Sequence, residues 1–321
     1  MDKTAVTVDE HVRFREEGHL VVRGLLQPDE LQELLEHIDE LVTERPDVLR
    51  VHMLHRELEI HERYLLHPRI VDVVAGLIGP DVLALQSMTF VKGPGSPGQG
   101  YHQDSFHIIS EPDTLVGAWV ALDRADEENG CVWITGGSQH EPVYPDADES
   151  KGHGGDVHLA DIQAVSGADD PDESKNGLTA IAVRYAGRER PAVLDQGDAV
   201  FFGGHVLHRS HANWSATRSR RAFVGHYCNA RSFTQWGANH DADDPHTAPS
   251  VDPETKMTNG SHILARGDTH LPFAKPTFGT QCAALLPAEE RRKESEYAAA
   301  MMADMDNDDM GAEPADPEVE H

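Results

Sequence analysis

Cysteine is scarce in this 321-residue sequence: Cys131, Cys228 and Cys282 lie far apart, and none belongs to a CxxC pair. An odd number of scattered thiols indicates neither a disulfide framework nor a thiolate zinc site. We therefore expect reduced thiols in an intracellular protein.

Long apolar runs are also missing. No stretch approaches the ~20 consecutive apolar residues of a transmembrane helix, and the N-terminal sequence has no basic segment followed by an apolar one. A chain without these features is expected to be soluble and cytoplasmic, with no membrane partner.

Positive charge is the third shortage. The chain has 27 Lys and Arg residues against 56 Asp and Glu, a formal net charge of -29, and only seven of the basic residues are Lys. So acidic a surface repels phosphate backbones, and nucleic acid is not an expected partner. Carboxylates spread along the chain would also suit a high-salt cytoplasm, which suggests a halophilic source.

The length favours one large β domain with helical additions. The first predicted element is a helix that opens at Gln27-Pro28-Asp29-Glu30, since Pro and acidic residues suit a first turn. Its apolar residues recur at intervals of three and four, which gives one face for packing: Leu31, Leu34, Leu35, Ile38 and Leu41. A shorter helix is predicted from Ile70 to Ile78, and a strand from Val82 to Val91.

Signals of an antiparallel β domain follow from Tyr101 onward. Val116 to Leu122 and Cys131 to Thr135 are strand-like, and the Asn129-Gly130 pair between them predicts a hairpin. Three further strands are predicted, with a turn at Gly197-Asp198: Ala192 to Leu194, Ala199 to Phe202 and Ala222 to Cys228.

These signals divide the chain into one domain and a tail. Residues 1–288 form the domain, with N-terminal helices over about 8–80, a β core over about 82–230 and an irregular extension over 231–288. Two polar, irregular stretches run from Asp146 to Gly177 and from Asn239 to Lys275, and the first is expected to be a loop near a binding site. The acidic tail, 289–321, is expected to be flexible.

His102-Gln103-Asp104 is a candidate for one side of a metal site. A non-haem iron(II) oxygenase needs two imidazoles and one carboxylate on one face of the metal, with open positions on the other. In an extended strand, residues two apart point to the same face, so His102 and Asp104 can reach one ion.

Another HxD sequence, at His37 and Asp39, lies on the first predicted helix. Helix positions two apart point about 200° away from each other, so these residues are expected to lie on a solvated helix face. For the second histidine, His205, His208 and His211 are all candidates. Spacing alone does not choose among the three.

Several further motifs follow His102-Gln103-Asp104 in order: Trp119-Val120-Ala121-Leu122-Asp123, Glu128-Asn129-Gly130, Gly137-Ser138-Gln139-His140, Gly197-Asp198, and His208-Arg209-Ser210 with Asn213 and Ser215. Together with the opening at Gly18 to Leu26, this succession resembles the phytanoyl-CoA dioxygenase family over roughly Val12 to Asn229. The specificity lies in the order of several motifs, since HxD alone is a weak signal.

The resemblance implies a mainly β fold with flanking helices and a double-stranded β-helix core, also called a jelly roll or cupin-like core. It selects His208 as the distal metal ligand, because that residue begins an HxS sequence. It also implies that Arg220, helped by Ser210, binds the distal carboxylate of 2-oxoglutarate, although Arg220 lies one residue later than usual between Arg218 and Arg221. A guanidinium fork matches a buried carboxylate.

The resemblance further implies polar side chains on the co-substrate or substrate just before the HxD sequence. Gln86 is assigned to 2-oxoglutarate, and Lys92 to the substrate pocket. Phe106, Trp119 and Trp133 are also assigned to that pocket, with Trp214, Phe223 and Trp236 as further aromatic candidates. Aromatic residues of a β domain more often belong to the core.

The expected function is that of an iron(II)- and 2-oxoglutarate-dependent dioxygenase that uses O2 and releases succinate and CO2. Asp104 favours hydroxylation, since halogenating relatives carry a small residue there. Desaturation, epimerisation and ring closure use the same ligands and stay open. A non-catalytic binding protein and a metal-dependent hydrolase or isomerase are the other classes, and succinate formation separates all three.

The expected substrate is a small metabolite or natural-product intermediate. An acyl-CoA is less favoured, because no clear basic cluster for the CoA phosphates is evident in the sequence. Fold-level analogy does not specify a substrate. The sequence predicts no oligomeric state.

Overall fold

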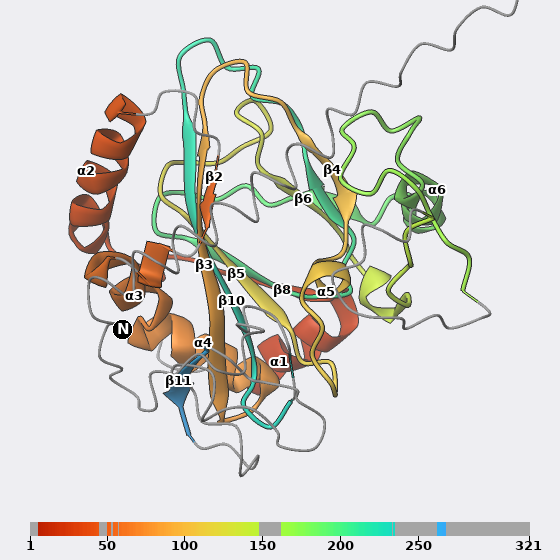
Figure 1. Cartoon of the computed structure of the whole chain (residues 1–321), viewed down its shortest axis with the longest axis horizontal. Helices are drawn as coiled ribbons and strands as arrows, with labels where there is room; N and C mark the ends of the chain where they lie inside the picture. The colour runs from red at the N-terminus through yellow and green to blue at the C-terminus, as the bar shows by residue number, and fades with distance from the viewer. Residues whose placement is uncertain are drawn as a thin grey trace, which may run out of the picture.

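The structure is a computed structural model that describes residues 6–44, 50–52, 54–56, 58–147, 162–232, 234 and 262–267. Two antiparallel sheets form its centre (Figure 1). The large sheet has seven strands, in the order β1 (His19–Val22), β8 (Ala199–Gly203), β5 (Val116–Ala121), β10 (Arg220–Asn229), β3 (Val82–Lys92) and β11 (Ile263–Arg266), with β2 (Arg50–His52) also on β3. The small sheet has the order β4 (Gln99–His102), β9 (His208–Ser210), β6 (Val132–Thr135) and β7 (Glu189–Pro191).

Helices flank these sheets. They are α1 (Val8–Glu17), α2 (Pro28–Glu44), α3 (Glu59–Leu65), α4 (Pro68–Ile78), α5 (Asp104–His107) and α6 (Leu178–Ala182), with short 3-10 segments at Leu54–Arg56, Ser138–His140 and Val183–Tyr185. In Figure 1, α1 to α4 lie along one side of the large sheet, and β4 and β6 lie on the other. Within the described ranges, no helix has the length and apolarity needed to cross a bilayer.

Side-chain alternation along β5 and β10 divides the core into two layers. On β5, Val116, Ala118 and Val120 pack with the helices, whereas Trp119 and Ala121 pack toward the small sheet. On β10, the corresponding residues are Phe223 and Tyr227 on the helix side, and Ala222 and Val224 on the other. This two-residue period places every second residue of the large sheet between the sheets.

The same period turns four polar residues inward. Arg220 and His226 share the inner face of β10 with Ala222 and Val224. On the neighbouring strand, Lys92 pairs with Arg220 and Gln86 pairs with His226. The inner face of the large sheet, which lies toward the small sheet, therefore has two polar ends. One end has the basic residues Arg220 and Lys92, and the other has the imidazole of His226 and the amide of Gln86.

The predicted fold class is confirmed: the structure is mainly β, with antiparallel sheets and flanking helices. The predicted helices and most predicted strands are present, with α4 beginning two residues early at Pro68. In the described part of the chain, the two sheets do not join into a closed barrel.

The predicted hairpin around Asn129-Gly130 is wrong. Strand β5 belongs to the large sheet and β6 to the small one, so the turn carries the chain from one sheet to the other. The Asn129 side chain is fully buried; it accepts a hydrogen bond from the Asp126 N–H and donates to the carbonyls of Arg124 and Ser219. These side-chain hydrogen bonds stabilise a turn without strand pairing across it.

Three other elements differ from the predictions. Helix α1 precedes the helix that was expected first, and a reciprocal capping box between Thr7 and Glu10 begins it. Strand β11 lies within the stretch 239–275 that was expected to be irregular. The strand expected at 192–194 is displaced to β7, just before it. The tail at 289–321 and most of 231–288 lie outside the described residues.

The helical layer should contribute strongly to stability through α2. Leu34 has 0% exposure in the core between this helix and the large sheet, so Leu34→Ala should lower the free energy of unfolding by about 2–5 kcal/mol. Urea denaturation measures this change. The exposed Glu40 on the same helix is the control, and Glu40→Ala should stay within about 0.5 kcal/mol of wild type. Equal effects of the two substitutions would show that α2 does not pack as described.

Candidate metal centre

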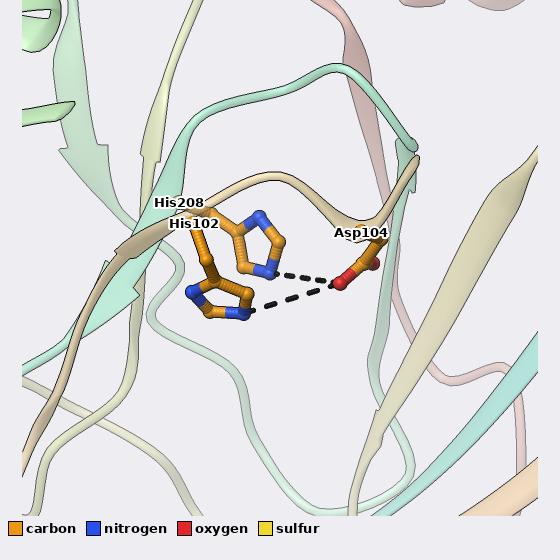
Figure 2. Close-up of side chains that lie close together, drawn as sticks. All are labelled: His102, Asp104 and His208. Atoms are coloured by element: carbon orange, nitrogen blue, oxygen red, sulfur yellow. Dashed lines mark ion pairs between the residues drawn. The ribbon is translucent and has the colours of Figure 1, made fainter. Parts of the chain in front are cut away.

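His102, Asp104 and His208 lie together between the two sheets (Figure 2). The Asp104 Oδ1 atom is 3.9 Å from Nε2 of His102 and 3.6 Å from Nε2 of His208. One ligand atom from each of the three residues lies within 4.8 Å of the other two. Among the described residues, this is the one such group that can hold a metal ion.

The strand pairing brings the three side chains together. His102 ends β4 and pairs directly with His208 on β9. Gln103 remains extended, with φ −125° and ψ 123°, and Asp104 opens α5. The prediction that His102 and Asp104 share one side is therefore correct, although Asp104 begins a helix instead of continuing the strand.

Gln103 points away from the metal ligands and fixes their backbone. Its buried amide donates hydrogen bonds to the carbonyls of Pro142 and His205, and its Oε1 accepts one from the Tyr144 N–H. Three polar contacts on one buried side chain hold the HxD segment against two loops.

Both metal-site imidazoles are oriented by their own backbone. Nδ1 of His102 lies 2.9 Å from the Gly100 carbonyl, and Nδ1 of His208 lies 2.9 Å from the Val206 carbonyl. A carbonyl oxygen only accepts, so each Nδ1 carries the proton and each Nε2 presents a lone pair. Two imidazole nitrogens and a carboxylate oxygen form the donor set of non-haem iron(II) oxygenases.

Electrostatics favours the protonation states that bind a metal. Burial alone would raise the pKa of Asp104, but the imidazoles of His208, His226 and His102 outweigh it and hold this pKa well below its usual value. Burial, followed by the influence of His102, lowers the pKa of His208 to about 4. Neutral imidazole and ionised carboxylate are the ligating forms.

The alternative distal histidines have other surroundings. His205 directs Nε2 to Asp113 Oδ2 at 3.0 Å and Nδ1 to the Glu141 carbonyl at 2.8 Å. His211 stacks on Trp214, with 5.5 Å between ring centroids. His37, from the other HxD sequence, lies on α2 with its ring against His61. The structure thus brings His208, and not these residues, to His102 and Asp104.

A second polar cluster lies at the other end of the inner face. Lys92 Nζ donates to the Ser210 hydroxyl at 2.9 Å and to the His211 carbonyl at 2.8 Å. Beside it, Arg220 is 3% exposed, its Nε has no hydrogen-bond partner, and its guanidinium lies 5.3 Å from the Trp119 ring centre. Within the described ranges, neither cation forms an ion pair.

The neighbouring arginines differ from Arg220 in this respect. Arg218 pairs with Asp126 and Glu128, and Arg221 pairs with Asp123 and Asp39. Of the three, only Arg220 faces the space between the sheets without a carboxylate partner among the described residues.

Burial disfavours the charged forms of Arg220 and Lys92 in this second cluster. It lowers the pKa of Arg220 to about 10 and, together with the charge of Arg220, lowers the pKa of Lys92 to about 7. Two buried cations without an anion are costly. A ligand with a carboxylate would supply the missing charge.

The remaining predicted residues lie in different places. Gln86 donates to His226 Nδ1 at 3.0 Å. Phe106 lies edge-on to His107, and Trp119 lies under Arg220.

Three of the other aromatic candidates do not face the metal centre, and the fourth is not described. Trp133 pairs with Arg209 and contacts His211, on the face of the small sheet opposite His208. Phe223 packs with the helices, and Trp214 is 65% exposed. Strand alternation and exposure therefore place these three side chains away from the metal centre. Trp236 lies outside the described residues.

Two residues near the site were not predicted. His226 Nε2 lies 3.2 Å from Asp104 Oδ2, and Asp169 Oδ1 lies 3.3 Å from His102 Nδ1. The two-residue period from Arg220 through Ala222 and Val224 could have placed His226 on the inner face. Asp169 comes from the long polar loop, where no local pattern distinguishes it from other acidic residues.

Residues 14–222 match the phytanoyl-CoA dioxygenase family (PhyH). The chain belongs to this family. A curated relative, "Phytanoyl-CoA dioxygenase domain-containing protein 1" of Danio rerio, is 25% identical over 297 residues, which cover 72% of this chain and 93% of the relative.

Solved structures share the fold of this PhyH-family chain. A "non-heme monooxygenase, ThoJ-Ni complex" aligns with a TM-score of 0.60 and 18% identity over 94% of this chain and 99% of its own. The "epimerase SnoN in complex with Fe3+, alpha ketoglutarate and nogalamycin RO" aligns with a TM-score of 0.56 and 21% identity over 78% and 93%.

PhyH-family proteins are non-haem iron oxygenases that depend on 2-oxoglutarate, so the predicted enzyme class is confirmed. The predicted cofactors, iron(II), 2-oxoglutarate and O2, are those of this class, and the His102, Asp104 and His208 group can hold the iron.

Removing a metal ligand should abolish iron binding in this family member. His208→Ala should weaken Fe(II) binding by more than the roughly 10–100-fold that outer-shell partners contribute, and His37→Ala should bind iron as wild type does. Anaerobic Fe(II) titration measures both. Full iron binding by His208→Ala, with loss in His205→Ala or His211→Ala, would move the third ligand.

Proposed function

We propose that this protein hydroxylates an unactivated C–H bond of a small-molecule metabolite or natural-product intermediate, with iron held by His102, Asp104 and His208. The main support for the proposal is that this donor set shares the inner surface with two buried basic side chains, Lys92 and Arg220, which form no ion pair with any described residue. A metal alone explains the first group but gives no reason for the second.

The two groups are spaced for a short dicarboxylate. His208 and Ser210 are two residues apart on β9, so their side chains share a face about 7 Å apart along the strand. Lys92 contacts Ser210, and Arg220 pairs with Lys92 across the large sheet. The keto acid end of 2-oxoglutarate would thus lie at the metal and its distal carboxylate at the cations.

When bound, iron(II) and 2-oxoglutarate supply the oxidising power for C–H oxidation by O2, with succinate and CO2 as products. The residues of the chain bind and orient. Arg220 and Lys92 neutralise the distal carboxylate, Ser210 adds a hydroxyl, and the two sheets exclude water from the charged pair. Such exclusion strengthens each charge interaction within the site.

Hydroxylation is favoured because the carboxylate of Asp104 supplies the third protein ligand to the metal. The carboxylate lies beside both imidazoles, and halogenation would need its place on the metal. The similar solved structures include an epimerase, so epimerisation, ring closure and desaturation are the alternative outcomes at the same site.

The expected substrate is a small molecule and not an acyl-CoA. Near the site, Arg218 and Arg221 are already paired with carboxylates, and Lys92 and Arg220 are assigned to the co-substrate. In the described part of the chain, these basic residues leave no free cluster for the CoA phosphates.

The experiment that tests this function is aerobic incubation with Fe(II), 2-oxoglutarate and pools of small metabolites. Mass spectrometry should detect succinate together with one product that has gained one oxygen. Loss of two hydrogens would indicate desaturation or ring closure instead. No succinate with any pool, from protein that binds both iron and 2-oxoglutarate, would contradict the proposal.

The assignment of Arg220 predicts a specific loss of co-substrate binding. Arg220→Ala should weaken 2-oxoglutarate binding to the metal-loaded protein by about 2–5 kcal/mol, because a desolvated carboxylate loses its charged partner. Iron affinity should change little, and Arg220→Lys should recover only part, since an ammonium cannot reproduce the fork. Anaerobic calorimetric titration with 2-oxoglutarate measures the change.

Two neighbouring arginines provide matched controls for Arg220. Arg218→Ala removes the ion pairs with Asp126 and Glu128, away from the inner face, and should leave 2-oxoglutarate binding within a few tenths of a kcal/mol. A large loss in Arg221→Ala without one in Arg220→Ala would shift the assignment by one residue. No loss in any of the three variants would remove arginine from the co-substrate site.

Lys92 should make co-substrate binding depend on pH. Its pKa of about 7 means that the ammonium is lost as the pH rises through neutrality, so affinity for the dianion should fall by up to about tenfold per unit above pH 7. Below that pH, Lys92 is charged and adds no slope. Titrations with 2-oxoglutarate between about pH 6 and 9 should show this slope in wild type and a flatter one in Lys92→Met. Equal slopes would contradict the assignment.

A further inference from the structure

The two oxygens of Asp104 have different partners. Oδ1 faces the metal-site imidazoles, at 3.9 Å from His102 and 3.6 Å from His208. Oδ2 lies 3.2 Å from Nε2 of His226, which is 4% exposed on the inner face of β10. An ionised carboxylate only accepts hydrogen bonds, so His226 donates from Nε2.

Gln86 fixes the proton of His226 at this position. The amide Nε2 of Gln86 lies 3.0 Å from Nδ1 of His226 and 3.5 Å from the sulfur of Met88. An amide nitrogen donates, so Nδ1 of the imidazole accepts, and its one proton lies on Nε2, toward Asp104. The orientation of the amide and the tautomer of the imidazole are thus coupled.

Gly117 provides the room for this contact. It lies directly opposite His226 across β5 and β10. A Cβ atom at this position would come within 3.3 Å of Asp104 Oδ2 and 3.0 Å of the Phe202 ring. Any side chain here would therefore press on the carboxylate that His226 holds.

We propose that Gln86 and His226 form a positioning pair, which holds Oδ2 of Asp104 so that the carboxylate binds the metal through Oδ1 alone. This inference rests on the proposed metal site. A carboxylate free to rotate would have to be ordered when the metal binds, and this loss of conformational entropy would weaken iron binding. Outer-shell hydrogen bonds of this kind orient metal ligands.

The test is Fe(II) affinity, measured by anaerobic titration without turnover. His226→Phe keeps a ring of similar size but donates no hydrogen bond, and it should weaken iron binding by roughly 10–100-fold. His226→Gln, whose amide can reach Oδ2, should recover most of the affinity. In metal-saturated protein, the 2-oxoglutarate dissociation constants of the variants and wild type should agree within about threefold, since the anion-binding end is untouched.

His61→Phe is the matched control. This residue is also fully buried, but it lies against Phe223 on the helix side of β10, so the same substitution should leave iron affinity unchanged. An equal loss of affinity in both Phe variants would show a general packing effect and overturn the proposal. So would wild-type iron affinity in His226→Phe.

Gln86→Leu provides a second route if His226→Phe does not fold. It leaves His226 in place but no longer fixes which ring nitrogen carries the proton. The loss of iron affinity should therefore be near the lower end of the roughly 10–100-fold range. Wild-type iron affinity in Gln86→Leu would then overturn the proposal. The parent protein separates this result from the proposed function: if wild type itself binds no iron, the metal site fails, whereas loss confined to the variants concerns only the positioning pair.

Discussion

The site depends on one constraint: two basic side chains and one carboxylate are buried between the two sheets, and they are too far apart along the inner face to pair with each other. Arg220 and Lys92 lie at one end of the inner face, and Asp104 lies at the other, beside three imidazoles. Burial disfavours each isolated charge, and partners outside the chain can relieve that cost only if they carry the opposite sign. A divalent cation at the carboxylate and a dicarboxylate at the cations satisfy both ends at once.

The apolar core tolerates this arrangement because it is divided into two layers. The helix-side layer is one continuous cluster of buried residues, and Leu31, Leu34 and Ile38 in it are fully buried. The inter-sheet layer is smaller, and polar residues interrupt it around the site. Stability thus comes chiefly from one face of the large sheet, which leaves the other face available for binding.

Other arginines of the same protein are paired with carboxylates. Arg209 pairs with Glu189 and Glu173 and lies over the Tyr101 ring, and Arg221 pairs with Asp123. An acidic chain has carboxylates available for such pairing, with 56 Asp and Glu against 27 Lys and Arg. Arg220 has no carboxylate partner among the residues that the structure describes, and this contrast favours an anionic ligand for it.

Sequence reasoning predicted the parts that local rules control. Periodicity located α2, α4, β3 and β10, and the HxD spacing with family resemblance located the three residues that the structure brings together. It failed where tertiary contacts decide. Asn129-Gly130 resembles a hairpin turn, but buried side-chain hydrogen bonds make it a crossover between sheets. Trp133 lies on the face of its strand that points away from the metal centre.

His226 and Asp169 show a different limit of sequence reasoning. Each touches a metal-site residue across more than sixty positions of sequence, and neither belongs to a spaced motif. Lys92 was assigned to the substrate pocket, and its contact with Ser210 places it beside the residues that we propose for 2-oxoglutarate. Such long-range contacts depend on strand register, which the sequence alone did not provide.

The most direct test of this account is a crystal structure of the protein with Mn²⁺ in place of iron and with 2-oxoglutarate, grown without O2. We expect anomalous signal from the metal between Nε2 of His102, Oδ1 of Asp104 and Nε2 of His208, with the distal carboxylate against Arg220, Lys92 and Ser210. A metal bound elsewhere, or a co-substrate whose distal carboxylate does not contact Arg220, would contradict it.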